Sequence, residues 1–199
     1  MIAIIDYGMG NLFSVEKAFV KLGAKVVVTN DEKVIMKADK VVLPGVGAFG
    51  DCMNNLEQSG LIPAIKEFIK SGKPFLGICL GLQLLFEESE ESPGVKGLSV
   101  FKGKVQKIIA PEFKIPHMGW NSLEFNNDSY LFEKMDINPY VYFVHSYQAV
   151  PSENIVTAFT EYGGKVTAAV GKDNVQAVQF HPEKSSAVGM NILTNFVNK

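Results

Sequence analysis

The chain has 199 residues, of which 47% are hydrophobic and 20% charged, values typical of a globular protein with a substantial core. Its formal net charge of −2 and its pI near 5.9 argue against nucleic acid or an anionic membrane as a partner. All 19 basic residues are lysines, so no guanidinium group is present to clamp a carboxylate or a phosphate. Any small anion must therefore be held by backbone amides, lysines or hydroxyls.

Cysteine and histidine are rare. Cys52 and Cys79 are too few for a disulfide framework, and a single bridge between them remains open. No signal peptide precedes the first strand, and no apolar run approaches the roughly 18 residues of a membrane span. We therefore expect a cytoplasmic protein with reduced thiols. His117, His145 and His181 stand singly, so we expect neither a metal site nor a metal cofactor.

The first half of the chain alternates short apolar strands with amphipathic helices. In chain order the sequence predicts a strand at 2–6, a helix at 12–22, strands at 25–29 and 40–43, a helix at 61–71 and a strand ending at Cys79. This alternation is typical of a parallel sheet covered on both faces. Gly8 and Gly10 follow the first strand as in a dinucleotide-binding loop. Phe13 stands where that fingerprint needs its third glycine, which favours a plain turn.

Two glycine-containing segments follow strands. Residues 44–50 hold three glycines, which allow a close backbone approach to an anion or simply form a flexible loop before a helix. In the second segment, Cys79 lies midway between Gly77 and Gly81, and residues 80–86 look like the opening of a helix. This is the strand–turn–helix pattern of a nucleophile elbow, and a helix N-terminus favours a thiolate. The alternative is a buried structural cysteine.

The second half is rich in strands. After an acidic run at 87–92, interpreted as a solvated face, the sequence predicts strands at 98–109, 121–125, 140–144, 155–159, 165–170 and 175–180, a connection at 113–121, and a closing helix at 185–198. With no linker and no repeat, we expect one domain over 1–199. The predicted fold class is α/β, with a mostly parallel central sheet flanked by helices, a nucleophile elbow and a β-rich C-terminal half.

The last predicted strand ends in a histidine and a carboxylate. His181 and Glu183 are two residues apart, so in an extended segment they point to the same side, and Pro182 is expected to keep that segment extended. A carboxylate beside an imidazole fixes its tautomer and stabilises the imidazolium. Together with the thiol of Cys79, these residues complete a predicted Cys-His-Glu triad.

Several stretches resemble a known family. Gly77-Ile-Cys-Leu-Gly81 with Gln83, Pro44-Gly-Val-Gly47 and Phe180-His-Pro-Glu183 are similar to class I glutamine amidotransferase domains. Pro116-His-Met-Gly-Trp-Asn121, Tyr142-Phe-Val-His-Ser-Tyr147 and Gln179-Phe-His-Pro-Glu-Lys-Ser-Ser186 resemble one branch of it, the glutaminase subunits of imidazole glycerol phosphate synthases in histidine biosynthesis. The resemblance covers essentially the whole chain.

The resemblance implies a role for each site residue. Cys79 is the expected nucleophile on the side-chain amide of glutamine, His181 the acid and base, and Glu183 its orienting partner. The expected oxyanion donors are Val46, Gly47 and Leu80, and the residues implied around bound glutamine are Gly45, Gln83, Glu91, His145, Ser146 and Tyr147. The absence of arginine agrees with a substrate carboxylate held by backbone amides.

The resemblance also implies a partner, since nothing in 199 residues is suited to a large phosphorylated acceptor. It is a (β/α)₈-barrel cyclase subunit that forms a heterodimer with this chain and receives ammonia through a tunnel. Trp120, Tyr142 and Lys184 match positions at that interface. The less favoured alternative for Trp120 is plain core or surface burial, and Lys184 could be an ordinary surface lysine.

Three other functions stay open at this point. One is a paralogous glutaminase that feeds another synthase, for example in sugar amidation. Another is a stand-alone cysteine hydrolase or peptidase, which leaves the motifs around Trp120 and His145 unexplained. The third is a degenerate regulatory subunit, disfavoured because all three triad residues are present.

Overall fold

The central element is an eight-stranded sheet. The structure, a computed structural model, describes all residues 1–199. From one edge to the other, the sheet contains β2 (Val26–Thr29), β1 (Ile2–Ile5), β3 (Lys40–Gly45), β4 (Phe75–Cys79), β13 (Val175–Val178), β12 (Lys165–Lys172), β11 (Val156–Glu161) and β8 (Glu124–Phe125). The first five strands are parallel, and the last three continue the sheet in antiparallel pairing. The predicted mostly parallel sheet is confirmed.

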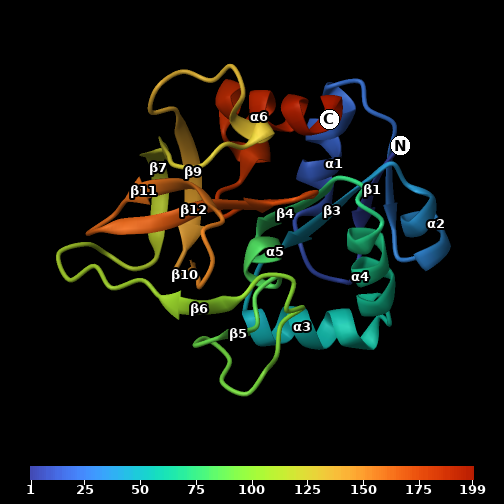
Figure 1. Cartoon of the computed structure of the whole chain (residues 1–199), viewed down its shortest axis with the longest axis horizontal. Helices are drawn as coiled ribbons and strands as arrows, with labels where there is room; N and C mark the ends of the chain where they lie inside the picture. The colour runs from blue at the N-terminus through green and yellow to red at the C-terminus, as the bar shows by residue number, and fades with distance from the viewer.

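Helices cover both faces of the parallel part (Figure 1). α1 (Leu12–Lys21) and α6 (Ser186–Asn198) pack on one face, and α2 (Glu32–Lys37), α3 (Phe49–Gln58) and α4 (Ile62–Lys70) pack on the other. Alternate residues of a strand point to opposite faces of the sheet. In β1, Ile2 and Ile4 pack in the core against α1 and α6, whereas Ala3 and Ile5 pack in the core against α2, α3 and α4. Burial on both faces explains why these strands are continuously apolar.

Two smaller sheets lie beside the antiparallel end of the large one. One contains β10 (Tyr147–Pro151), β6 (Gly103–Lys107) and β5 (Glu88–Ser89), and the other pairs β7 (His117–Ser122) with β9 (Tyr140–His145). Short 3₁₀ turns at Tyr130–Phe132 and Pro182–Lys184 complete the fold, with the one-turn helix α5 (Leu80–Gln83) after β4. Figure 1 shows this β-rich region at the left of the molecule, opposite α2 and α4.

Several predicted elements were wrong in extent. The helix after Cys79 lasts one turn instead of reaching residue 86, and the strand at 98–109 shrinks to β6, since Ser99 has φ 55°. The expected connection at 113–121 contains most of β7, and residues 121–125 divide between β7 and β8. The strand at 175–180 ends at Val178.

Several elements were not predicted, among them α2, α3 and β10. α2 has only six residues, and it begins where the Asp31 side chain accepts a hydrogen bond from the backbone N–H of Lys33. α3 begins inside the glycine segment at Phe49, and its caps come from Glu91 and Ser92, 42 residues further along the chain. β10 has no strong alternation in its sequence and is fixed by its antiparallel partner β6.

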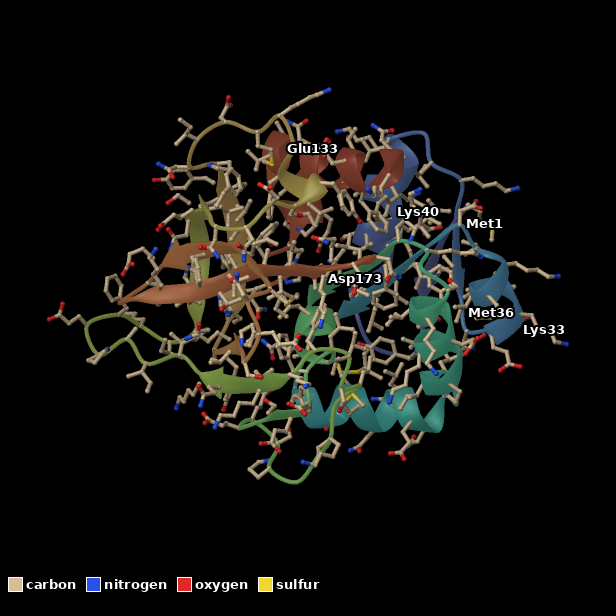
Figure 2. All side chains as sticks on the ribbon, viewed as in Figure 1. Met1, Lys33, Met36, Lys40, Glu133 and Asp173 are labelled. Atoms are coloured by element: carbon tan, nitrogen blue, oxygen red, sulfur yellow. The ribbon has the colours of Figure 1, made fainter.

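Charged side chains lie at the periphery. Figure 2 shows Lys33 on α2 at the edge of the molecule, and both Lys33 and Glu133 are exposed. The longest helix, α6, has 13 residues, and none of the helices has the length and apolarity needed to cross a bilayer.

Candidate active site

Cys79 lies at a sharp turn in the middle of the sheet. It is the last residue of β4 and directly precedes α5, with φ 55° and ψ −114°, a strained conformation for a residue with a side chain. A Cβ on Gly81 would collide with the carbonyl oxygen of Leu43, and one on Gly77 would lie 2.8 Å from the carbonyl oxygen of Gly81. Both glycines are therefore required for the close approach of β3, β4 and α5.

His181 and Glu183 meet in a tight turn. The Nδ1 of His181 lies 2.8 Å from Oε1 of Glu183, with only 3% and 1% of the two side chains exposed. The predicted geometry was wrong, because Pro182 opens a 3₁₀ turn instead of continuing an extended segment. The backbone of His181 is held from both sides: its N–H donates to the carbonyl of Tyr142, and its carbonyl accepts from the Ser185 hydroxyl.

The thiol and the carboxylate both act on the ring of His181. Burial lowers the pKa of this imidazole, but the hydrogen bonds and negative charges of Cys79 and Glu183 outweigh burial and raise it to about 10. At neutral pH the ring of His181 is therefore an imidazolium, held between the sulfur of Cys79 and the carboxyl group of Glu183. Both cysteines are free thiols, so no bridge joins Cys52 to Cys79.

A cavity of about 280 Å³ opens in front of the thiol. Most of the predicted site residues line it: Val46, Gly47, Cys79, Leu80, Gln83, Glu91, His145, Ser146, Tyr147 and His181. Two predicted residues do not line it. Glu183 lies on the far side of His181, as an orienting acid requires, and Gly45 is buried under the elbow, where an added Cβ would lie 2.9 Å from the backbone nitrogen of Gly81.

The loop after β3 forms one rim of the cavity. Val46 and Gly47 are exposed, and Gly47 has φ +96°, a conformation that a side chain would strain. The carbonyl of Val46 accepts a hydrogen bond from the thiol of Cys52 at 3.3 Å. Because the peptide is planar and trans, the N–H of Gly47 points away from Cys52. Burial raises the pKa of Cys52 to about 11, so this thiol stays protonated and keeps its donor.

Glu91 connects the cavity to the end of that loop. Its Oε2 accepts a hydrogen bond from the backbone N–H of Phe49, the first residue of α3, at 2.8 Å. Ser92 caps the next residue through its hydroxyl, which accepts from the N–H of Gly50 at 2.9 Å. The acidic run that was interpreted as a solvated face therefore places one carboxylate at the cavity, where it also anchors α3.

A buried pair of amides was not predicted. Gln179 is fully buried and lies next to the sulfur, with its Nε2 3.9 Å from Sγ of Cys79. Gln83 donates from Nε2 to Oε1 of Gln179 and to the carbonyl of Tyr147. Its position two residues before His181 was a signal that the sequence offered. The direction of its side chain, however, is set by contacts with Cys79 of β4 and Gln83 of α5, and through Gln83 with Tyr147 of β10.

The three residues expected at a partner interface lie near the catalytic turn. Trp120 and Tyr142 face each other across β7 and β9, with ring centroids 6.2 Å apart, and Trp120 is 51% exposed. Plain burial therefore does not explain Trp120. Lys184 is exposed at the end of the 3₁₀ turn. The N–H of His181, the residue before this turn, donates a hydrogen bond to the carbonyl of Tyr142.

Comparison with known proteins identifies the family. A family model described as glutamine amidotransferase class-I matches residues 3–199. The chain belongs to this family. Among solved structures of similar fold, one of a glutamine amidotransferase covers 100% of both chains with a TM-score of 0.78 at 16% identity. Another, of PurLQS from Thermotoga maritima, covers 99% of this chain and 97% of its own, with a TM-score of 0.71 at 19% identity.

Curated relatives within the class-I glutamine amidotransferase family are much closer in sequence. The imidazole glycerol phosphate synthase subunit HisH of Methanothermobacter thermautotrophicus is 55% identical over 197 residues, which cover 99% of this chain and 98% of that protein. The protein of the same name from Aquifex aeolicus is 52% identical over 199 residues, covering 98% and 95%. The residues matched by the family model include the elbow, the turn at Pro182–Lys184 and all the residues that line the cavity.

Proposed function

We propose that this protein is the glutaminase subunit of an imidazole glycerol phosphate synthase and supplies ammonia for histidine biosynthesis. The observation that carries the proposal is the meeting of Cys79 and His181 at one small cavity, with the carboxyl group of Glu183 bonded to the far side of the imidazole. Support for the particular synthase comes from relatives at 51% to 55% identity that carry that subunit's name over nearly their whole length. The whole chain, 1–199, acts as a single amidotransferase domain in this proposal.

The chemistry follows from the geometry of the thiol and the imidazole. The sulfur of Cys79 attacks the side-chain amide carbon of glutamine, and the carbonyl electrons move onto oxygen. The tetrahedral intermediate collapses as the C–N bond breaks, and His181 gives its proton to the departing nitrogen, which leaves as ammonia. Neutral His181 then takes a proton from water, which attacks the thioester and releases glutamate together with the thiolate.

The oxyanion needs N–H donors at the mouth of the cavity. Those of Gly47 and Leu80 lie on two segments that flank Cys79, the exposed loop and the first residue of α5. We propose that these two N–H groups, together with that of Val46, donate hydrogen bonds to the oxygen that becomes negatively charged. Each such donor contributes about 10²- to 10³-fold in turnover. Gln83, Glu91, Ser146 and Tyr147 hold the amino-acid end of the substrate, and His145 shapes the wall beside it.

The cavity also explains why a second subunit is needed. A volume of about 280 Å³ is at the lower end of small-molecule sites and suits an amino acid, not a phosphorylated ribotide. We propose that the acceptor binds to a (β/α)₈-barrel cyclase subunit, which forms a heterodimer with this chain through Trp120, Tyr142 and Lys184. The two free thiols support a reducing, cytoplasmic location.

The test separates the two half-reactions in the complex. Cys79→Ala is expected to abolish synthesis from glutamine and to leave synthesis from added ammonium salt unchanged. Loss of both activities would contradict the role of this chain as the ammonia donor. A protein that hydrolyses peptides or esters without a partner, or one that responds only to a different synthase, would point to another function.

A further inference from the structure

We propose that Gln179 is a further catalytic residue, whose side-chain amide donates a hydrogen bond to the sulfur of Cys79, and that His117 is a positioning residue for this amide. The inference deepens the proposed function, because it assigns new roles in the same reaction. It rests on a continuous line of buried and partly buried hydrogen bonds that leads from β7 to the sulfur of Cys79.

The surroundings of the sulfur offer few donors. α5 has only four residues, so its dipole stabilises negative charge on the sulfur of Cys79 less than a longer helix would. Besides the ring of His181, the side-chain donor beside the sulfur is Nε2 of Gln179, at 3.9 Å. Contacts of this kind are long in a resting enzyme and shorten when charge develops. A neutral amide stabilises a thiolate without competing with His181 for the proton.

The orientation of the Gln179 amide follows from its neighbours. The carbonyl of Tyr147 can only accept, so Gln83 must present its NH₂ group there, at 3.2 Å. The same NH₂ group lies 2.9 Å from Gln179, which must therefore present its oxygen to Gln83. The NH₂ group of Gln179 is left for the sulfur of Cys79. Rotating either amide would place two acceptors or two donors in contact.

The line continues beyond Tyr147 through two neutral histidines. Because the Tyr147 carbonyl accepts, Nδ1 of His145 carries the proton in their 2.8 Å contact. Nε2 of His145 then accepts from Nδ1 of His117 at 3.0 Å, and Nε2 of His117 accepts from the amide of Asn121 at 3.2 Å. Burial lowers the pKa of His145 to about 3 and that of His117 to about 4, which keeps both rings neutral.

The rings have little freedom to choose another arrangement. His117 is 2% exposed and stacks between Phe143 and Tyr162, with ring centroids 4.6 and 4.0 Å away. Both nitrogens of His145 are used internally, so this side chain fixes the wall of the cavity and has no nitrogen free for a ligand. His117 therefore acts on the sulfur only through His145, Tyr147 and the two glutamines.

The test measures how fast iodoacetamide alkylates Cys79 as a function of pH, with the modified peptide identified by mass spectrometry. It needs neither glutamine nor a partner. The midpoint of the profile reports stabilisation of the thiolate, and the plateau at high pH reports access to the cavity. Gln179→Met is expected to move the midpoint to higher pH and to slow alkylation at pH 6.5 about tenfold. Gln83→Met, which frees the amide of Gln179 to rotate, should shift the midpoint in the same direction by less.

A matched control comes from β13, the strand that ends directly before Gln179. Gln176 is also a buried glutamine, but its side chain bonds to Ser129, away from the sulfur. Gln176→Met should leave the midpoint unchanged even if it lowers stability. A midpoint that stays at the wild-type value in both Gln179→Met and Gln83→Met would overturn the assignment. If Gln179→Met does not fold, Gln83→Met decides alone.

The role of His117 has its own pair of variants. His117→Phe keeps the stacking but removes the donor to His145, and should move the midpoint about half as far as Gln179→Met. His117→Gln restores an N–H donor and should return the midpoint toward the wild-type value. Equal midpoints for wild type and His117→Phe would overturn the positioning role. Because alkylation does not require glutaminase activity, failure of the proposed function would leave these outcomes readable.

Discussion

The elbow at Cys79 and the loop at Val46–Gly47 border the same cavity but are built in opposite ways. The elbow lies in the centre of the sheet, is buried, and is packed so closely that Gly77 and Gly81 have no room for a Cβ. The loop is exposed, and a Cβ on Gly47 would meet only the methyl group of Met9, at 3.1 Å. The fold itself therefore fixes Cys79 and the N–H of Leu80, whereas the backbone of Val46 and Gly47, the other proposed oxyanion donors, is held by few contacts.

The elbow is also held by more hydrogen bonds than the loop. The elbow is held by the hydrogen bonds of β4 with β3 and β13, which unfold only with the sheet. The loop is held by single side chains: Cys52 on the carbonyl of Val46, and Glu91 on the first N–H of α3. A partner that displaces one such bond can reorganise the oxyanion donors without disturbing the thiol, which is what coupling between two sites requires.

The largest effect is expected where the elbow is most tightly packed. Gly81→Ala forces a methyl group against the carbonyl of Leu43 and should lower the free energy of unfolding by about 4 kcal/mol or more, measured by urea denaturation. Gly94→Ala is the control, since its Cβ would meet open space at φ +89°; it should cost about 1 kcal/mol. Equal losses would mean that the elbow is not specially constrained.

The fixed side of the site also depends on the charge of Glu183. Glu183→Gln keeps the shape of the turn but removes the charge facing His181, and should lower glutamine turnover in the complex by about 10³-fold. The pKa of His181 in the folded protein, about 10, lies above its usual 6.5. The stabilisation of the folded state by the His181–Glu183 ion pair is therefore complete below pH 6.5 and is lost as the pH rises through 10. The difference in unfolding free energy between wild type and Glu183→Gln should narrow over that range. A difference that does not change with pH would contradict the ion pair.

In the exposed loop at Val46–Gly47, activity should suffer more than stability. Gly47→Ala strains a backbone at φ +96° but adds its methyl group in an exposed loop, so the cost in unfolding free energy should be only about 1 kcal/mol. Turnover of glutamine in the complex should fall about 100-fold, because an oxyanion donor is misplaced. A variant with full turnover would remove Gly47 from the oxyanion site.

The smallest effect is expected at the far end of the same loop. Ser92→Ala removes one of the two caps of α3 and should cost about 1 kcal/mol, with turnover lowered a few-fold because Glu91 still holds Phe49. Ser59→Ala is the matched control at the other end of α3, where the hydroxyl donates to Leu56. It should lower stability by a similar amount without changing turnover. Identical turnover in the two variants would show that the cap does not affect the loop.

Local patterns predicted the first strands, their parallel sheet and the strand–turn–helix at Cys79. They failed where distant residues complete an element: α3 is capped by residues 42 positions away, and β7 forms because it pairs with β9. The turn at Pro182–Lys184 was predicted as extended, since the hydroxyl of Ser185 that braces it has no local signature. The contact of Gln179 with Cys79 joins positions 100 residues apart and was beyond a local pattern.

The most direct measurement compares glutamine hydrolysis by this protein alone and in complex with the cyclase subunit carrying its nucleotide ligand. If the thiol is fixed and the oxyanion donors are adjustable, the isolated protein should be nearly inactive. Binding of the ligand-loaded partner should then raise turnover about 100-fold or more, the contribution of one correctly placed oxyanion donor. Equal rates with and without the partner would contradict the account, because they would mean that both halves of the site are already assembled in this chain.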